Sequence, residues 1–119
     1  MKIRLFFQSI LILFLITCKG PTSPSDPVVY EYFSVGQQRV IDSGWVPEWK
    51  ALSVTVEDFK WISREERYFM CGDVLSEGCF STRPPRIEYP AMIPRAIIHE
   101  SGHAILWKLK HPDWKKWEH

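Results

Sequence analysis

The feature that most constrains this sequence is a stretch near its end, IIHESGHAIL at residues 97–106, in which titratable groups interrupt an apolar run. Pro94 suits the first turn of a helix, and Pro112 cannot lie inside one. Between the prolines, apolar or small residues recur at helical spacing, at Ile98, Ser101, Gly102, Ile105 and Leu109. The stretch therefore predicts an amphipathic helix. A glycine within it costs about 1 kcal/mol against alanine, so we expect another backbone to pack closely at Gly102.

Two of the histidines lie four residues apart on this expected helix. His99 and His103 would project from one face, about one turn apart. That spacing lets both imidazoles reach a single ion at about 2 Å. Glu100 is offset around the helix, so it would not bind the ion but could reach a water molecule on it.

This arrangement, His-Glu-x-x-His on an apolar helix, resembles that of the zincin metallopeptidases. The resemblance implies a small α+β domain, in which a short mixed or antiparallel sheet packs on the active-site helix and a short C-terminal helix follows. It also implies one Zn²⁺ per chain and a peptide or protein substrate. Peptide bonds would be hydrolysed by a metal-activated water, with Glu100 as general base.

The third zinc ligand is open. The metzincin pattern is excluded, because Leu106 and Leu109 stand where it needs Gly and His. His111 is the tentative choice, since the segment that it begins resembles that of SprT-like zincins. In an unbroken helix, His111 would lie about 12 Å along the axis from His103. The helix would therefore have to end near Trp107.

A helical hairpin offers the alternative ligands. If the chain turned back at His111 and Pro112, an antiparallel second helix would bring Glu118 or His119 level with His103. This geometry resembles a shortened gluzincin. His119 is the alternative third ligand, although a terminal residue is prone to fray.

The N-terminal residues 1–18 predict an export signal. Lys2 and Arg4 precede an apolar stretch, Leu5–Ile16, that has the length of a secretory h-region. The stretch ends at Cys18, which resembles the lipidated cysteine of bacterial lipoproteins, although Thr17 departs from the usual residue before it. We expect a bacterial protein that is exported and lipid-anchored at Cys18 to the cell envelope, at the outer membrane or cell surface. The alternative is an ordinary secretory signal with an incidental cysteine.

The rest of the chain divides into a tether and one domain. Residues 19–27 are rich in Pro, Ser and Gly and predict a flexible tether, and residues 28–119 are expected to form a single zincin-like domain. In an exported protein, Cys71 and Cys79 are expected to form a disulfide. Free or metal-binding thiols are the alternative.

The middle of the chain suggests strands. Residues 28–33 are β-prone, and residues 51–56 alternate between apolar and polar as a strand does. Residues 58–70 suit either a helix capped by Asp58 or another strand. Residues 84–90 have proline on both sides and predict an edge strand, whose Arg86–Tyr89 backbone would bind an extended peptide substrate.

Charge excludes one class of partner. Lysine and arginine number 15 against 14 acidic residues in a chain of 119, so no nucleic-acid surface is expected. The alternative to a peptidase is a non-catalytic surface lipoprotein that binds metal or a partner.

Overall fold

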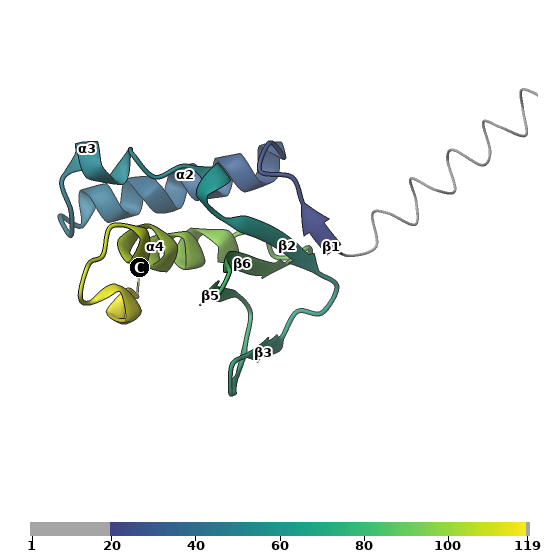
Figure 1. Ribbon diagram of the computed structural model, residues 1–119. Coiled ribbons are helices and arrows are strands. Elements are labelled where there is room, and N and C mark those ends of the chain that lie inside the picture. The colour runs from purple at the N-terminus through teal and green to yellow at the C-terminus, as the bar shows by residue number, and fades with distance from the viewer. Residues whose placement is uncertain (1–19, 119) are drawn as a thin grey trace, which may run out of the picture.

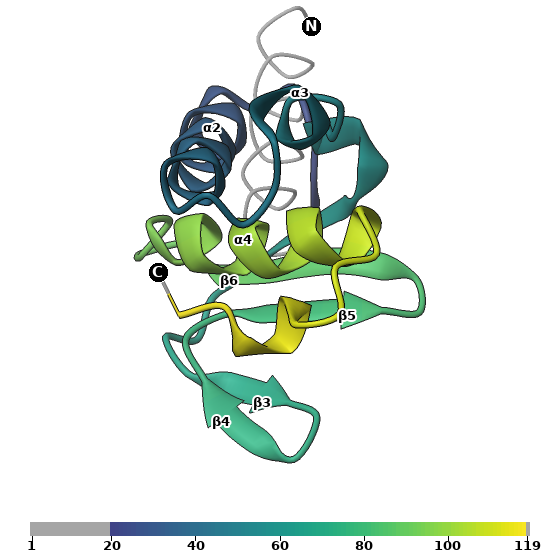
Figure 2. The same cartoon turned by 90° about the vertical axis from the view of Figure 1, so that its left-hand side faces the viewer.

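Helix α4, which carries the His-Glu-x-x-His residues, lies between helix α2 and the main sheet (Figures 1 and 2). The structure is a computed structural model that describes residues 20–118. Its helices are α2 (Pro27–Asp42), α3 (Glu48–Ala51) and α4 (Ala96–Lys108), with 3₁₀ turns η1 (Val56–Asp58) and η2 (Trp114–Lys116). This arrangement confirms a small α+β fold. Across residues 20–118, no helix has the length and apolarity needed to span a bilayer.

The main sheet has four strands in the order β1-β2-β6-β5. Strands β2 and β6 run parallel, and the other two pairings are antiparallel. The strands are β1 (Gly20–Thr22), β2 (Lys60–Arg64), β5 (Cys79–Thr82) and β6 (Pro85–Pro90). A separate antiparallel hairpin, formed by β3 (Phe69–Cys71) and β4 (Val74–Ser76), projects below the sheet (Figure 2).

The expectation of an edge strand at residues 84–90 is half right. The segment is a strand, β6, but it lies between β2 and β5. Its prolines, Pro85 and Pro90, fall at its two ends, so the residues between them keep their N–H groups for pairing. The last strand of the sheet on this side is β5.

Residues 28–33, expected to be β-prone, belong instead to helix α2. The Asp26 side chain caps this helix by accepting a hydrogen bond from the Val28 N–H at 2.8 Å, and Pro27 occupies the first turn. The helix buries one face, at Val29, Phe33, Gly36 and Val40. Packing of this face overrides the local strand preference. A Cβ at Gly36 would lie 2.7 Å from the Ile98 carbonyl oxygen of α4, so the two helices touch here.

Two other local expectations are resolved by the structure. Residues 51–56 do not form a strand, because Ala51 ends α3 and the Gln37 side chain donates hydrogen bonds to the Ala51 and Val54 carbonyls at 2.9 and 3.0 Å. These are carbonyl groups that a neighbouring strand would otherwise use. For residues 58–70 the strand alternative is right, since β2 and the start of β3 lie there.

Part of the expected tether belongs to the sheet. Residues 20–22 form β1, which pairs antiparallel with β2 from Gly20 opposite Ser63 to Thr22 opposite Trp61. Backbone pairing needs no apolar side chains, so a segment of this composition can still add a strand to an open edge. The expected export signal, Cys18 and Lys19 lie outside the described residues.

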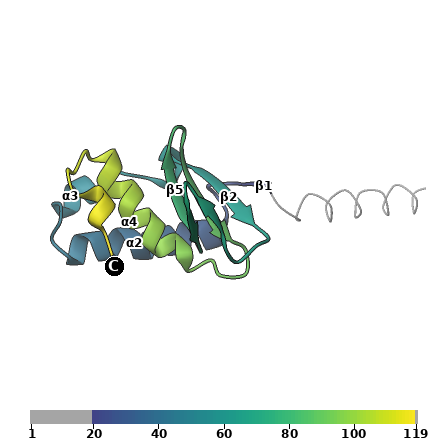
Figure 3. The same cartoon turned by 90° about the horizontal axis from the view of Figure 1, so that it is seen from below.

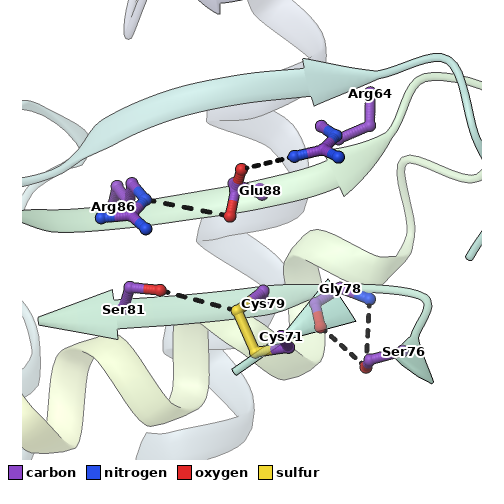
Figure 4. The surroundings of a disulfide bond; sticks show 8 residues. All are labelled: Arg64, Cys71, Ser76, Gly78, Cys79, Ser81, Arg86 and Glu88. Carbon is purple, nitrogen blue, oxygen red and sulfur yellow. Dashed lines mark hydrogen bonds and ion pairs between the residues drawn. A yellow bond between two sulfur atoms is a disulfide. The ribbon is translucent and has the colours of Figure 1, made fainter. Parts of the chain in front are cut away.

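The expected disulfide is present between Cys71 and Cys79 (Figure 4). Their Cα atoms lie 5.4 Å apart, which is within the ordinary range for a disulfide. The bond joins the end of β3 to the start of β5. It therefore ties the β3–β4 hairpin to the last strand of the main sheet.

Helix α4 confirms the helix expected between Pro94 and Pro112. Ser101, Gly102 and Ile105 are buried, as the helical spacing indicated, and Ile98 and Leu109 are half-buried. The contact at Gly102 differs from the expected backbone. The buried Trp117 indole occupies the space that a Cβ would fill. Figure 3 shows the C-terminal segment turning back along α4.

Candidate active site

The two imidazoles of helix α4 point at the same position. The Nε2 atoms of His99 and His103 lie 3.0 Å apart, and the rings are nearly perpendicular. This proximity follows from the four-residue spacing, which places both residues on one helix face. Since 3.0 Å is less than twice a zinc–nitrogen bond of about 2.1 Å, one ion could bind both atoms.

The orientation of the His103 ring is set from outside the helix. Its Nδ1 lies 2.7 Å from the Trp114 carbonyl oxygen in η2. A carbonyl only accepts hydrogen bonds, so Nδ1 carries the proton and Nε2 keeps its lone pair. Desolvation by burial lowers the pKa of His103, and the charge of His99 adds to this, while the bond to Trp114 opposes it. The net effect favours the neutral imidazole, which is the form that binds metals.

Glu100 faces strand β5. A backbone hydrogen bond at Phe80 holds its carboxyl group, and Gly78 lies against its side chain. A Cβ at position 78 would fall 2.9 Å from Glu100 Cγ, so any larger residue there would displace the carboxyl group. Desolvation by burial raises the pKa of Glu100 to about 7, and the bond at Phe80 only partly opposes this. A carboxyl group with that pKa can both accept and donate a proton near neutral pH.

All three side chains line one open cleft of about 1070 Å³. Strand β5 and residues of the β3–β4 hairpin form one side of it, and η2 contributes Trp114 and Lys115. A smaller cavity of about 160 Å³ is lined by Glu100 and His103 together with Phe80 and Trp114. The two histidines and the glutamate are thus brought together at a surface that a substrate could reach.

His111, the tentative third ligand, is not brought to this pair. Helix α4 does end near Trp107, at Lys108, and the His111 N–H donates to the Leu106 carbonyl at 2.9 Å, which closes the helix end. The His111 ring packs on Trp45, with ring centroids 5.2 Å apart, and its Nδ1 accepts from the Asp113 N–H at 3.0 Å. The residue does not line the cleft.

The helical hairpin expected as the alternative is partly correct. The C-terminal segment does turn back, through a 3₁₀ turn and not an α-helix, and Trp117 reaches Gly102. Glu118 is exposed. His119 lies outside the described residues. Within residues 20–118, no group of three or more His, Cys, Asp or Glu residues is arranged to hold a metal ion.

The donors that are present fit part of a zinc site. Two convergent imidazoles are ligands that zinc commonly uses, and the bond from His103 to a carbonyl is the support that zinc-binding histidines usually have. A complete site with an open position needs a third protein ligand. Residues 20–118 supply two of the three.

Sequence reasoning missed the groups that surround the motif. These groups belong to segments outside α4: they are the Trp114 carbonyl, the Phe80 backbone and Gly78. Every residue has a backbone carbonyl, so the sequence does not indicate which one contacts the motif. No pattern in the sequence around the motif indicates any of these three groups.

Comparison of the chain with protein-family models, with curated proteins and with solved structures gives no match. The class of the protein therefore has to be argued from its own residues.

Proposed function

We propose that this chain is a zinc-dependent peptidase of a small zincin-like type. His99 and His103 would hold one Zn²⁺, and Glu100 would transfer protons. The observation that supports this most strongly is the pair of Nε2 atoms 3.0 Å apart, beside a buried glutamate in an open cleft. If His99 and His103 were only solvated residues on a helix surface, there would be no reason for a buried glutamate and an open cleft to lie beside them.

The chemistry divides between the ion and the protein. Bound zinc would supply Lewis acidity to water and to the scissile carbonyl. Glu100, with a pKa of about 7, accepts a proton from the attacking water and later donates it to the leaving amine. Its hydrogen bond with the Phe80 backbone holds the carboxyl group in one position, and so sets the point at which Glu100 accepts the proton. His103 stays neutral and oriented through the Trp114 carbonyl.

The substrate would bind along β5. This strand takes the role first expected of Arg86–Tyr89, because β6 has a neighbour on both sides and β5 ends the sheet. An extended peptide added to a free strand edge gains main-chain hydrogen bonds. Residues of the hairpin, tied to β5 by the disulfide, line the same cleft.

We also propose that the protein is exported and anchored by lipid at Cys18. The disulfide supports export, because such bonds persist mainly in oxidising compartments. Mass spectrometry of the mature protein is expected to show an N-terminus at Cys18 that carries lipid. An intact N-terminus at Met1 would contradict the anchor.

One observation favours a non-catalytic alternative. Residues 20–118 contain no metal-holding group of three or more ligands, so the chain could be a surface lipoprotein that binds a metal or partner without hydrolysis. The same histidines would then bind an ion, and no peptide bond would be hydrolysed.

The variant Glu100→Gln separates the two functions. In the peptidase it removes the proton acceptor, so hydrolysis of a peptide library should fall at least about 100-fold while zinc content stays the same. Glu31→Gln, at an exposed position of α2, is the matched control and should keep full activity. A zinc-loaded wild-type protein that cuts no peptide would favour the binding function, and equal hydrolysis by Glu100→Gln would exclude the assigned role of Glu100.

A further inference from the structure

The charged side chains that line the cleft are mostly cationic. Arg83 directly follows β5, Arg86 lies in β6 opposite Ser81, and Lys115 lies in η2 beside Trp114. Glu100 is the one carboxylate among the described residues that line this cleft. The proposed function does not use any of the three cations.

Two of these cations have no carboxylate partner within residues 20–118. The ion pairs of this region involve other residues, and neither Arg83 nor Lys115 takes part in one. Both side chains are exposed. Lys115 Nζ lies 5.5 Å from the centroid of the Trp114 ring, which keeps this charge beside the wall of the cleft.

Arg86 is only partly neutralised. Its Nε lies 3.8 Å from Glu88 Oε2, but the other oxygen of that carboxylate is held by Arg64 at 2.9 Å (Figure 4). One buried carboxylate therefore serves two guanidinium groups. Some positive charge at Arg86 remains available to a ligand in the cleft.

Glu100 does not offset these charges. Its carboxyl group is buried and engaged by the Phe80 backbone, with Gly78 against its side chain. The cavity of about 160 Å³ next to it is lined by Glu100 and His103 together with Cys71, Phe80, Trp114 and Lys115. A side chain that enters this cavity meets two aromatic rings, and Lys115 is the one lysine or arginine that residues 20–118 contribute to its lining.

We propose that the cleft selects acidic peptides, that is, extended segments that carry Asp or Glu side chains opposite Lys115 and opposite Arg83 and Arg86. That such peptides are also cut rests on the proposed function. That they bind selectively does not depend on it. The cations make the cleft electrostatically positive. Strand β5, the last strand of the sheet, offers main-chain hydrogen bonds to an extended peptide. Complementary charge then determines which peptide sequences bind.

The test measures binding apart from cleavage. The full chain with Glu100→Gln is purified in detergent and titrated into fluorescein-labelled octapeptides at low salt, and anisotropy gives the dissociation constants. The peptides are identical except for two positions, which hold Glu, Gln or Lys. Exposed ion pairs contribute up to about fivefold each. The Glu peptide should therefore bind about tenfold more tightly than the Gln peptide, and the Lys peptide should bind most weakly.

Charge-neutral variants locate the preference. Lys115→Gln should reduce the Glu-to-Gln affinity ratio to about threefold. Arg83→Gln should reduce it less, because Arg86 remains, and the triple variant that adds Arg86→Gln should abolish it. Lys116→Gln and Arg39→Gln remove the same charges at exposed positions that do not line the cleft. These controls should leave the ratio unchanged.

The outcomes separate this inference from the proposed function. Equal affinity for the Glu and Gln peptides, or no binding of either, overturns the acidic preference. An equal loss of preference in the Lys116 and Arg39 controls overturns its assignment to the cleft. If the preference is found but the wild-type enzyme cuts none of the peptides, the peptidase proposal fails and the acidic selectivity stands.

Discussion

The indole of Trp117 lies directly on Gly102, in the space that any larger side chain at position 102 would occupy. Both residues are buried. This contact brings the C-terminal segment against the middle of α4, next to His103. The same segment supplies the Trp114 carbonyl that orients His103. The contact at Gly102 therefore places this segment beside the helix face that carries His99 and His103.

Replacing this glycine should destabilise the protein. Gly102→Ala would gain about 1 kcal/mol in helix propensity, but it overlaps the Trp117 indole and forces the segment to move, and overpacking of this kind costs about 1–3 kcal/mol. Because the overlapping atoms belong to a buried indole, we expect a net loss of up to about 2 kcal/mol, measured by urea unfolding.

A double-mutant cycle is the control for this prediction. In a Trp117→Ala background the overlap disappears, so Gly102→Ala should become neutral or stabilising. If Gly102→Ala stabilises the protein in the presence of Trp117, the close contact is not a constraint.

Zinc binding should depend on both imidazoles. We expect about one zinc per purified chain, lost in His99→Ala and in His103→Ala, because each Nε2 supplies one of few bonds to the ion. Elemental analysis after zinc supplementation and dialysis measures this. Chelation should also lower the thermal unfolding temperature, since an ion that binds only the folded state stabilises it. A protein that takes up no transition metal would contradict the prediction.

The third ligand is open to a direct comparison. His111→Ala should change the zinc dissociation constant by less than about threefold, well under the tenfold or more typical of losing a ligand's support. The physical reason is that its ring packs on Trp45 and its Nδ1 accepts from the Asp113 N–H. Competition with a chelating dye gives the dissociation constants of His111→Ala, Glu118→Gln and a chain that lacks His119. Release of zinc by His111→Ala alone would mean that the turn after α4 opens to bind the ion.

The disulfide should stabilise the hairpin side of the cleft. The double variant Cys71→Ala/Cys79→Ala should lose about 2–3 kcal/mol of unfolding free energy, the chain-entropy value for so short a loop. Urea unfolding measures the loss, and a reducing agent should weaken the wild-type protein but not the variant. Thiols at both positions that alkylate without prior reduction would rule the bond out.

The sequence by itself determined the helix that carries the site. The prolines at 94 and 112, the apolar spacing between them and the four-residue separation of the histidines are all local, so they specify α4 and the shared face of His99 and His103. The disulfide between Cys71 and Cys79 was also predicted, because these two cysteines remain to pair in an exported protein whose Cys18 carries lipid.

Only the tertiary structure decided what surrounds that helix. Residues 28–33 prefer strands locally but form part of α2, because burying Val29 and Phe33 outweighs local propensity. Strand order placed β6 inside the sheet and left β5 as its last strand, and no pattern within one strand encodes its neighbours. The groups that orient His103 and engage Glu100 are a backbone carbonyl and a backbone hydrogen bond from distant segments. Every residue carries such groups, so only the folded chain shows which ones reach the site.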